Sequence, residues 1–138
     1  MIKNIEVSLV NATKSLDGLS VGDAFGELFF RFSPFYTKFE DLPTASWKWT
    51  DDTHMALSIV EILKKHQRID QDELAKAFAK RYVADPRRGY AGGAHHLLGE
   101  VAQGANWREI HQNYLEMVPM ETAGQCALLR LVAFSMMI

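Results

Sequence analysis

The chain has 138 residues and a formal net charge of −2, and 48% of its residues are hydrophobic. This length is enough for one globular domain with a buried core. The weak negative charge argues against a nucleic-acid or anionic-membrane partner, and no stretch approaches the roughly 20 apolar residues of a membrane span. A single cysteine excludes an internal disulfide framework and fits a reducing compartment. We therefore expect a cytoplasmic protein with residues 1–138 in a single helical domain.

Hydrophobic spacing predicts a first helix over about residues 5–23. Its far end is rich in glycine, and such small residues would let neighbouring backbone or a ligand come close. The phenylalanine-rich segment 25–39 contains Pro34 and is expected to be a loop whose aromatic rings pack against the core.

Four further helices are expected, at residues 53–66, 71–83, 94–103 and from Trp107 onward. The first of these four is apolar around most of its circumference, so it should be central and buried. Asp85-Pro86 ends the next one. Asn106 and Glu109 resemble a capping box for the last. Because no strand signal or internal repeat is present, the predicted fold class is all-α.

The segment Thr50-Asp51-Asp52-Thr53 is the densest group of oxygen ligands in the chain. Two adjacent carboxylates between two hydroxyls suit Mg²⁺, Mn²⁺ or Ca²⁺ rather than zinc. The segment also lies where a helix begins, so Asp51 or Asp52 is equally suited to cap that helix. The residues alone leave both interpretations open.

Other segments carry polar residues that are candidates for ligand binding or catalysis. Residues 22–27 hold two carboxylates near glycines, either for acid–base work or as solvated acids at a helix end. Residues 87–90 combine guanidinium groups, an aromatic ring and a glycine, which suits a phosphate or nucleotide sugar or, equally, an ordinary exposed loop. His95 and His96 point about 100° apart on a helix, which argues against a shared metal. Cys126 lacks a basic neighbour in sequence, which argues against a nucleophilic role.

Three motifs in this order resemble the ADP-ribosylglycohydrolase family. They are Gly18-Leu19-Ser20-Val21-Gly22-Asp23-Ala24-Phe25-Gly26-Glu27, Trp49-Thr50-Asp51-Asp52-Thr53-His54-Met55 and Arg88-Gly89-Tyr90-Ala91-Gly92-Gly93-Ala94. The resemblance covers about residues 1–110. It implies a helical bundle like the N-terminal half of that fold, built around two Mg²⁺ or Mn²⁺ ions. The implied reaction is hydrolysis of the glycosidic bond between ADP-ribose and a protein side chain or small molecule.

The resemblance also implies roles for individual residues. The implied roles are metal binding for Thr50, Asp51 and Asp52, catalysis for Asp23 and Glu27, and substrate binding for Arg88, Gly89, Tyr90 and Gly92. The chain departs from the family pattern at one point. Many members place a glutamate four residues after the second glycine, where this chain has Phe30, so Glu27 is the available substitute.

Residues 111–138 diverge from the family pattern. They lack its second metal-ligand set, an Asp-x-Asp-Thr cluster, and its Gly-Asn-Gly-x-x-Met-Arg loop. When codons for residues 120–127 are back-translated and read from the third base of the first codon, they give Gly-Asn-Gly-x-x-Met-Arg. We therefore hypothesise a frameshift near residues 110–115, which makes the tail an out-of-frame peptide.

Three functional hypotheses remain at this stage. The first is a metal-dependent hydrolase acting on an ADP-ribose-containing substrate. The alternative is a truncated, catalytically inactive pseudoenzyme that acts only as a self-associating or weak ligand-binding helical module. The third is a small helical phosphohydrolase, for which residues 70–73 are the other acidic run, although acids there are better explained as a helix N-terminus. Because half of the family fold leaves apolar surface uncovered, we expect a homo-oligomer.

Overall fold

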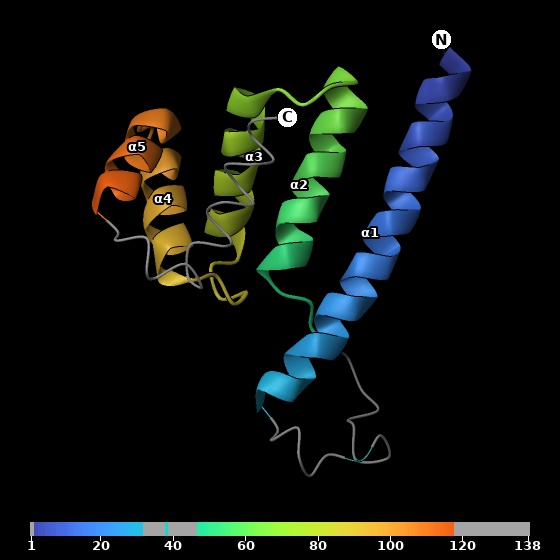
Figure 1. The fold of residues 1–138 in the computed structure, drawn as a ribbon, viewed down its shortest axis with the longest axis horizontal. Coiled ribbons are helices and arrows are strands. Elements are labelled where there is room, and N and C mark those ends of the chain that lie inside the picture. Colours follow the sequence, from blue (N-terminus) through green and yellow to red (C-terminus); the bar gives the residue numbers. More distant parts are fainter. Residues whose placement is uncertain (1, 32–37, 39–46, 118–138) are drawn as a thin grey trace.

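In a computed structural model, the described part of the chain comprises residues 2–31, 38 and 47–117. Within these ranges it contains helices and no strand, so the predicted all-α fold class is confirmed (Figure 1). The helices are α1 (Ile2–Arg31), α2 (Asp51–His66), α3 (Gln71–Ala84), α4 (Gly92–Ala102) and α5 (Trp107–Met117). No helix of the described residues is long and apolar enough to cross a membrane.

Helix α2 lies between α1 and α3, and α4 packs on α3 with α5 beside it (Figure 1). The predicted central position of α2 is therefore confirmed. The main core joins α2, α3, α4 and the segment before α4. Its buried side chains are Ile62, Leu74, Ala75, Phe78, Tyr90, Ala94, Leu97 and Leu98.

Helix α1 is longer than the sequence predicted. We expected it to end near residue 23, but it continues to Arg31. A glycine inside a helix costs only about 1 kcal/mol relative to alanine, and burial of Ala24 against the neighbouring helix favours continuation. Phe25 and Phe29 consequently lie in α1, with ring centroids 5.0 Å apart, and the predicted loop is wrong for them. Phe30 also lies in α1, so the predicted loop is wrong for it as well, and the remaining aromatic residues of segment 25–39 lie outside the described residues.

The starts of α3 and α5 follow their predicted capping signals. The Asp70 carboxylate accepts a hydrogen bond from the Glu73 backbone N–H at 3.1 Å, which confirms that the acidic run 70–73 is a helix N-terminus. The Asn106 side chain accepts from the Arg108 backbone N–H at 3.1 Å and donates to Glu109 at 3.0 Å. Local sequence therefore decides where these helices begin.

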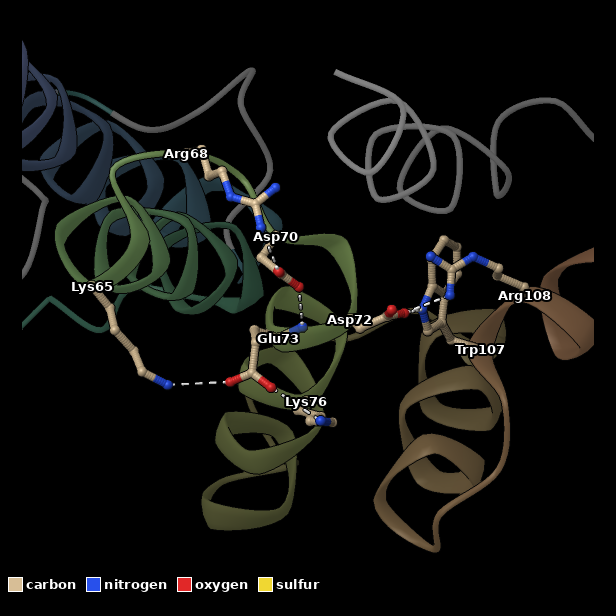
Figure 2. A network of polar contacts seen from close by, with 8 residues as sticks. All are labelled: Lys65, Arg68, Asp70, Asp72, Glu73, Lys76, Trp107 and Arg108. Carbon is tan, nitrogen blue, oxygen red and sulfur yellow. Dashed lines mark hydrogen bonds and ion pairs between the residues drawn. The ribbon is translucent and has the colours of Figure 1, made fainter.

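Charged side chains at the start of α3 connect it to α2 and α5, as Figure 2 shows. Glu73 pairs with Lys65 of α2 at 3.2 Å. Asp72 accepts from the Trp107 indole at 2.8 Å and from Arg108 at 2.5 Å. Because these groups are exposed, we expect each pair to contribute little individually. Together they fix the register of α5 against α3.

Candidate active site

The acidic segment lies at the N-terminus of α2. The helix begins at Asp51, so both Asp51 and Asp52 belong to its first turn and Thr50 occupies the N-cap position. The interpretation of Asp51 or Asp52 as the capping residue is therefore wrong. Their carboxylates instead lie at the positive end of the helix dipole, which favours negative charge.

Asp23 of α1 performs the capping that the sequence assigned to the acid pair. One carboxylate oxygen accepts from the Thr50 hydroxyl at 2.5 Å. The other accepts from the Thr50 backbone N–H at 2.7 Å, the Thr53 backbone N–H at 3.2 Å and the Thr53 hydroxyl at 2.5 Å. Partial burial alone would raise the pKa of Asp23, but these hydrogen bonds outweigh it and hold the pKa below its usual value.

The two acids of α2 differ in their surroundings. Asp51 is 7% exposed, whereas Asp52 is exposed. Burial, together with the charges of Asp52 and Asp23, raises the pKa of Asp51 to about 6. Desolvation and the charge of Asp23 also raise the pKa of Asp52. Three carboxylates held this close repel one another, so a cation beside them would be favourable.

The loop between α3 and α4 approaches these acids from the other side. Arg88 donates to the Trp49 carbonyl oxygen at 3.0 Å and to the Asp85 carboxylate at 2.7 Å. Its guanidinium carbon lies 4.3 Å from the centroid of the Trp49 ring. Gly89 has φ +89°, and a Cβ at this position would lie 3.3 Å from Asp51 Oδ1. A glycine therefore permits the close approach of the loop.

Tyr90 lies beneath this surface. It is 6% exposed, and its hydroxyl is 3.0 Å from Nδ1 of His54, which is also 6% exposed. Burial and the charge of Asp51 raise the pKa of Tyr90 to about 12. Burial and the nearby charges of Arg88 and Arg81 lower the pKa of His54. This pair supports the acidic segment from inside the core.

A pocket of about 340 Å³ lies next to the acidic segment. Residues from all three sequence motifs line it, together with Arg87 of the predicted basic loop and with Lys48, which the sequence analysis did not select. The lining residues are Glu27, Lys48, Trp49, Thr50, Asp85, Arg87, Arg88 and Gly89. The positively charged lining beside carboxylates suits a ligand that carries both phosphate and hydroxyl groups.

The predicted site residues thus divide into two groups. Glu27, Thr50, Arg88 and Gly89 meet at the pocket, and Asp51 and Asp52 follow Thr50 directly. Asp23 is instead hydrogen-bonded to Thr50, and Tyr90 is hydrogen-bonded to His54. Gly92 is the exposed first residue of α4. The sequence analysis missed Lys48, and its signal was a basic residue between two tryptophans directly before the acidic segment.

The donor set fits one side of a site for a hard divalent cation. The Thr50 hydroxyl and the carboxylates of Asp51 and Asp52 are oxygen ligands of the kind that Mg²⁺ and Mn²⁺ prefer. Among the described residues, no group of three or more His, Cys, Asp or Glu side chains is arranged to hold a metal ion. These three residues alone would therefore supply only part of the coordination shell of such an ion.

Comparisons with known proteins show which family the chain resembles. The family model described as ADP-ribosylglycohydrolase matches residues 9–138. The chain is 40% identical over 50 residues to ADP-ribosylhydrolase ARH3 of Homo sapiens, covering 36% of this chain and 14% of that protein. It is 42% identical over 45 residues to ADP-ribosylhydrolase ARH3 of Bos taurus, covering 33% of this chain and 12% of that protein. No solved structure matches the chain.

The matched stretches are thus a small part of the length of these curated relatives. The family match continues through residues 111–138. The frameshift origin of that segment stays a prediction, and residues 118–138, including Cys126, lie outside the described structure. The match covers nearly the whole chain, and all three motifs contribute residues to one pocket. The chain therefore belongs to the ADP-ribosylglycohydrolase family.

Proposed function

We propose that this chain contributes to metal-dependent hydrolysis of the glycosidic bond between ADP-ribose and a protein side chain or small molecule. The observation that carries the proposal is the position of the Thr50–Asp52 oxygen ligands beside a pocket lined with basic residues. An ADP-ribosyl group carries ribose hydroxyls and a diphosphate. The Thr50–Asp52 oxygen ligands suit the hydroxyls through a bound metal ion, and the basic residues of the pocket suit the diphosphate. The single cysteine is consistent with a cytoplasmic location.

In this proposal Thr50, Asp51 and Asp52 hold Mg²⁺ or Mn²⁺. Such an ion, when bound, orients ribose hydroxyls and lowers the pKa of a water molecule. Asp51 is buried and its pKa is raised to about 6, so a neighbouring cation would favour its ionised form. Asp52 is exposed at the same helix end and is available to ligands from outside the chain.

The remaining pocket residues have distinct roles in the proposal. Lys48 and Arg87 are exposed and attract the diphosphate. Arg88 is bonded to the loop backbone and to Asp85, so it mainly keeps the pocket wall in place. Glu27 and Asp85 are the half-buried carboxylates of the pocket lining, and Glu27 is the candidate for proton transfer with the leaving group or water.

Further ligands to the metal would come from outside the described residues. Hard cations take about six oxygen ligands, and the Thr50–Asp52 segment supplies only part of that number. A second copy of the chain or another polypeptide is the proposed source. Oligomerisation is therefore part of the proposed function rather than an independent property.

The test is isothermal titration of ADP-ribose into the protein with and without Mg²⁺. We expect binding in the micromolar range that requires the metal and weakens in Asp52→Asn. Arg87→Ala should weaken ADP-ribose binding by about three- to tenfold, because one exposed charge contact is lost. Arg68→Ala is the matched control, since Arg68 is an exposed arginine paired with Asp70 beyond the far end of α2.

Two results would contradict the proposal. The first is no ADP-ribose binding in either condition, which would favour a helical module without the hydrolase site. The second is equal weakening of ADP-ribose binding by Arg87→Ala and Arg68→Ala. Binding would then depend on the overall charge of the protein and not on a contact in the pocket.

A further inference from the structure

Asp23 connects two helices through a single side chain. Its carboxylate accepts hydrogen bonds from Thr50 and Thr53, which lie 27 and 30 residues further along the chain. All four donors lie in the segment that carries the candidate metal ligands: two backbone N–H groups and two hydroxyls. Hydrogen bonds to a charged acceptor are stronger than those between neutral groups.

The alternative role for Asp23 is proton transfer during catalysis, which the sequence suggested. The geometry argues against it in two ways. Both carboxylate oxygens already accept hydrogen bonds, and the residues that line the pocket include Glu27 of the same helix but not Asp23. Asp23 therefore contacts the acidic segment and is not part of the pocket lining.

The orientation of Thr50 depends directly on this contact. The Thr50 hydroxyl donates its hydrogen bond to Asp23, so only lone pairs of the Thr50 oxygen remain for a cation. The backbone bond from Thr50 N–H to Asp23 fixes the residue before α2, and the bonds from Thr53 fix the end of its first turn. Asp51 and Asp52 lie between these two fixed points.

The hydrogen bonds of Asp23 are important for holding α1 against the acidic segment, because α1 lies outside the main core. The main core is formed by α2, α3, α4 and Tyr90, while α1 lies on the outer side of α2 (Figure 1). Close to Asp23, Ala24 is buried and the Phe25 ring lies 5.5 Å from that of Trp47. The Asp23 bonds and these contacts together hold the segment 47–53 against α1.

We propose that Asp23 is a positioning residue that orients Thr50, Asp51 and Asp52 for metal binding and does not contact the substrate. The part of this inference that concerns metal rests on the proposed function. The part that concerns the orientation of the acidic segment is independent of it.

The experiment compares Asp23→Asn with Asp17→Asn, an exposed acid on the same helix. An asparagine keeps the size of the side chain but replaces one acceptor oxygen with a donor NH₂ group. Amide hydrogen exchange at Thr50 and Thr53 is measured by NMR without metal, and Mn²⁺ affinity by calorimetry. In Asp23→Asn we expect both amides to exchange at least about tenfold faster and Mn²⁺ binding to weaken about tenfold. Asp17→Asn should resemble the parent.

Thr53→Val provides a second variant in case Asp23→Asn fails to fold. It removes one hydroxyl donor from the contact and nearly conserves the side-chain shape, so we expect the same changes at about a third of the size. Circular dichroism of each variant reports whether helix content is kept.

The outcomes separate the two proposals. Unchanged exchange at Thr50 and Thr53 in Asp23→Asn would overturn the positioning role. Unchanged Mn²⁺ affinity with lost hydrolysis would also overturn it, because that pattern is expected of a proton-transfer residue. If the parent itself does not bind Mn²⁺, the proposed function fails, and faster exchange at the two amides still supports the orienting role of Asp23.

Discussion

Gly89 determines how closely the loop before α4 approaches the acids of α2. Its φ of +89° is unfavourable for residues with a side chain, and an added Cβ would lie 3.3 Å from Asp51 Oδ1. We expect Gly89→Ala to lower the free energy of unfolding by about 1–2 kcal/mol, measured by urea denaturation. It should also weaken Mn²⁺ binding, because Asp51 must move.

Gly104 provides the control for this substitution. It has a similar φ of +96°, but an added Cβ there has nothing within 4 Å. Gly104→Ala should therefore show the loss of stability without a change in Mn²⁺ affinity. Equal effects of the two substitutions on Mn²⁺ affinity would show that the contact between Gly89 and Asp51 is unimportant.

Two tyrosine–histidine hydrogen bonds differ mainly in burial. The bond between Tyr90 and His54 is buried, whereas that between Tyr82 and His95 is exposed. Tyr90→Phe should lower the free energy of unfolding by about 1–3 kcal/mol, because it leaves a buried polar atom unpaired. Tyr82→Phe should lower it by less than about 1 kcal/mol, since water can replace the lost hydroxyl. Chemical denaturation of both variants tests the difference, and equal losses would contradict it.

Between elements, the polar contact between the start of α5 and the start of α3 depends on Asp72. Hydrogen bonds from Trp107 and Arg108 lower the pKa of the Asp72 carboxyl below its ordinary value of 3.8. The ionised form is therefore favoured by folding. Its stabilising contribution is fully present above the ordinary pKa and is lost as the pH falls through the lowered folded-state pKa.

The measurement is the thermal midpoint of the parent and Asp72→Asn between pH 7 and pH 2. The parent should have the higher midpoint at pH 7, and the difference should disappear at the acidic end. Trp107 fluorescence reports the loss of the α3–α5 contact directly. A difference that stays constant over the whole range would mean that the charge of Asp72 is not involved.

At the scale of the whole molecule, α1 presents apolar side chains to solvent. Val10 is 53% exposed and Val21 is 62% exposed, and their spacing of eleven residues places them on the same side of a helix. This exposed apolar surface favours self-association through α1. We expect sedimentation velocity at micromolar concentration to show an oligomer.

Substitution of Val21 tests whether α1 forms the interface. Val21→Lys should shift the sedimentation coefficient toward the monomer, because burial of a lysine charge in an interface is unfavourable. Val83→Lys is the control, since Val83 is 61% exposed on α3. A monomeric parent, or an equal shift in both variants, would contradict self-association through α1.

The sequence by itself determined the helices whose ends depend on nearby residues. The start of α3 follows from Asp70 and that of α5 from Asn106, because capping bonds join residues two or three positions apart. The order of the three motifs likewise identified the family. The end of α1 was wrong because the glycine signal near residue 23 is weak, and packing against α2 decided the outcome.

Only the tertiary structure decided what the individual polar residues contact. The sequence showed Asp23 as an acid near glycines, but its partners lie 27 and 30 residues away. It presented Tyr90 as a surface residue, whereas packing buries its ring against His54. Lys48 became a candidate only when the pocket joined its segment to the basic loop of Arg87 and Arg88. Side-chain hydrogen bonds and burial depend on neighbours that folding brings together, so local sequence does not determine them.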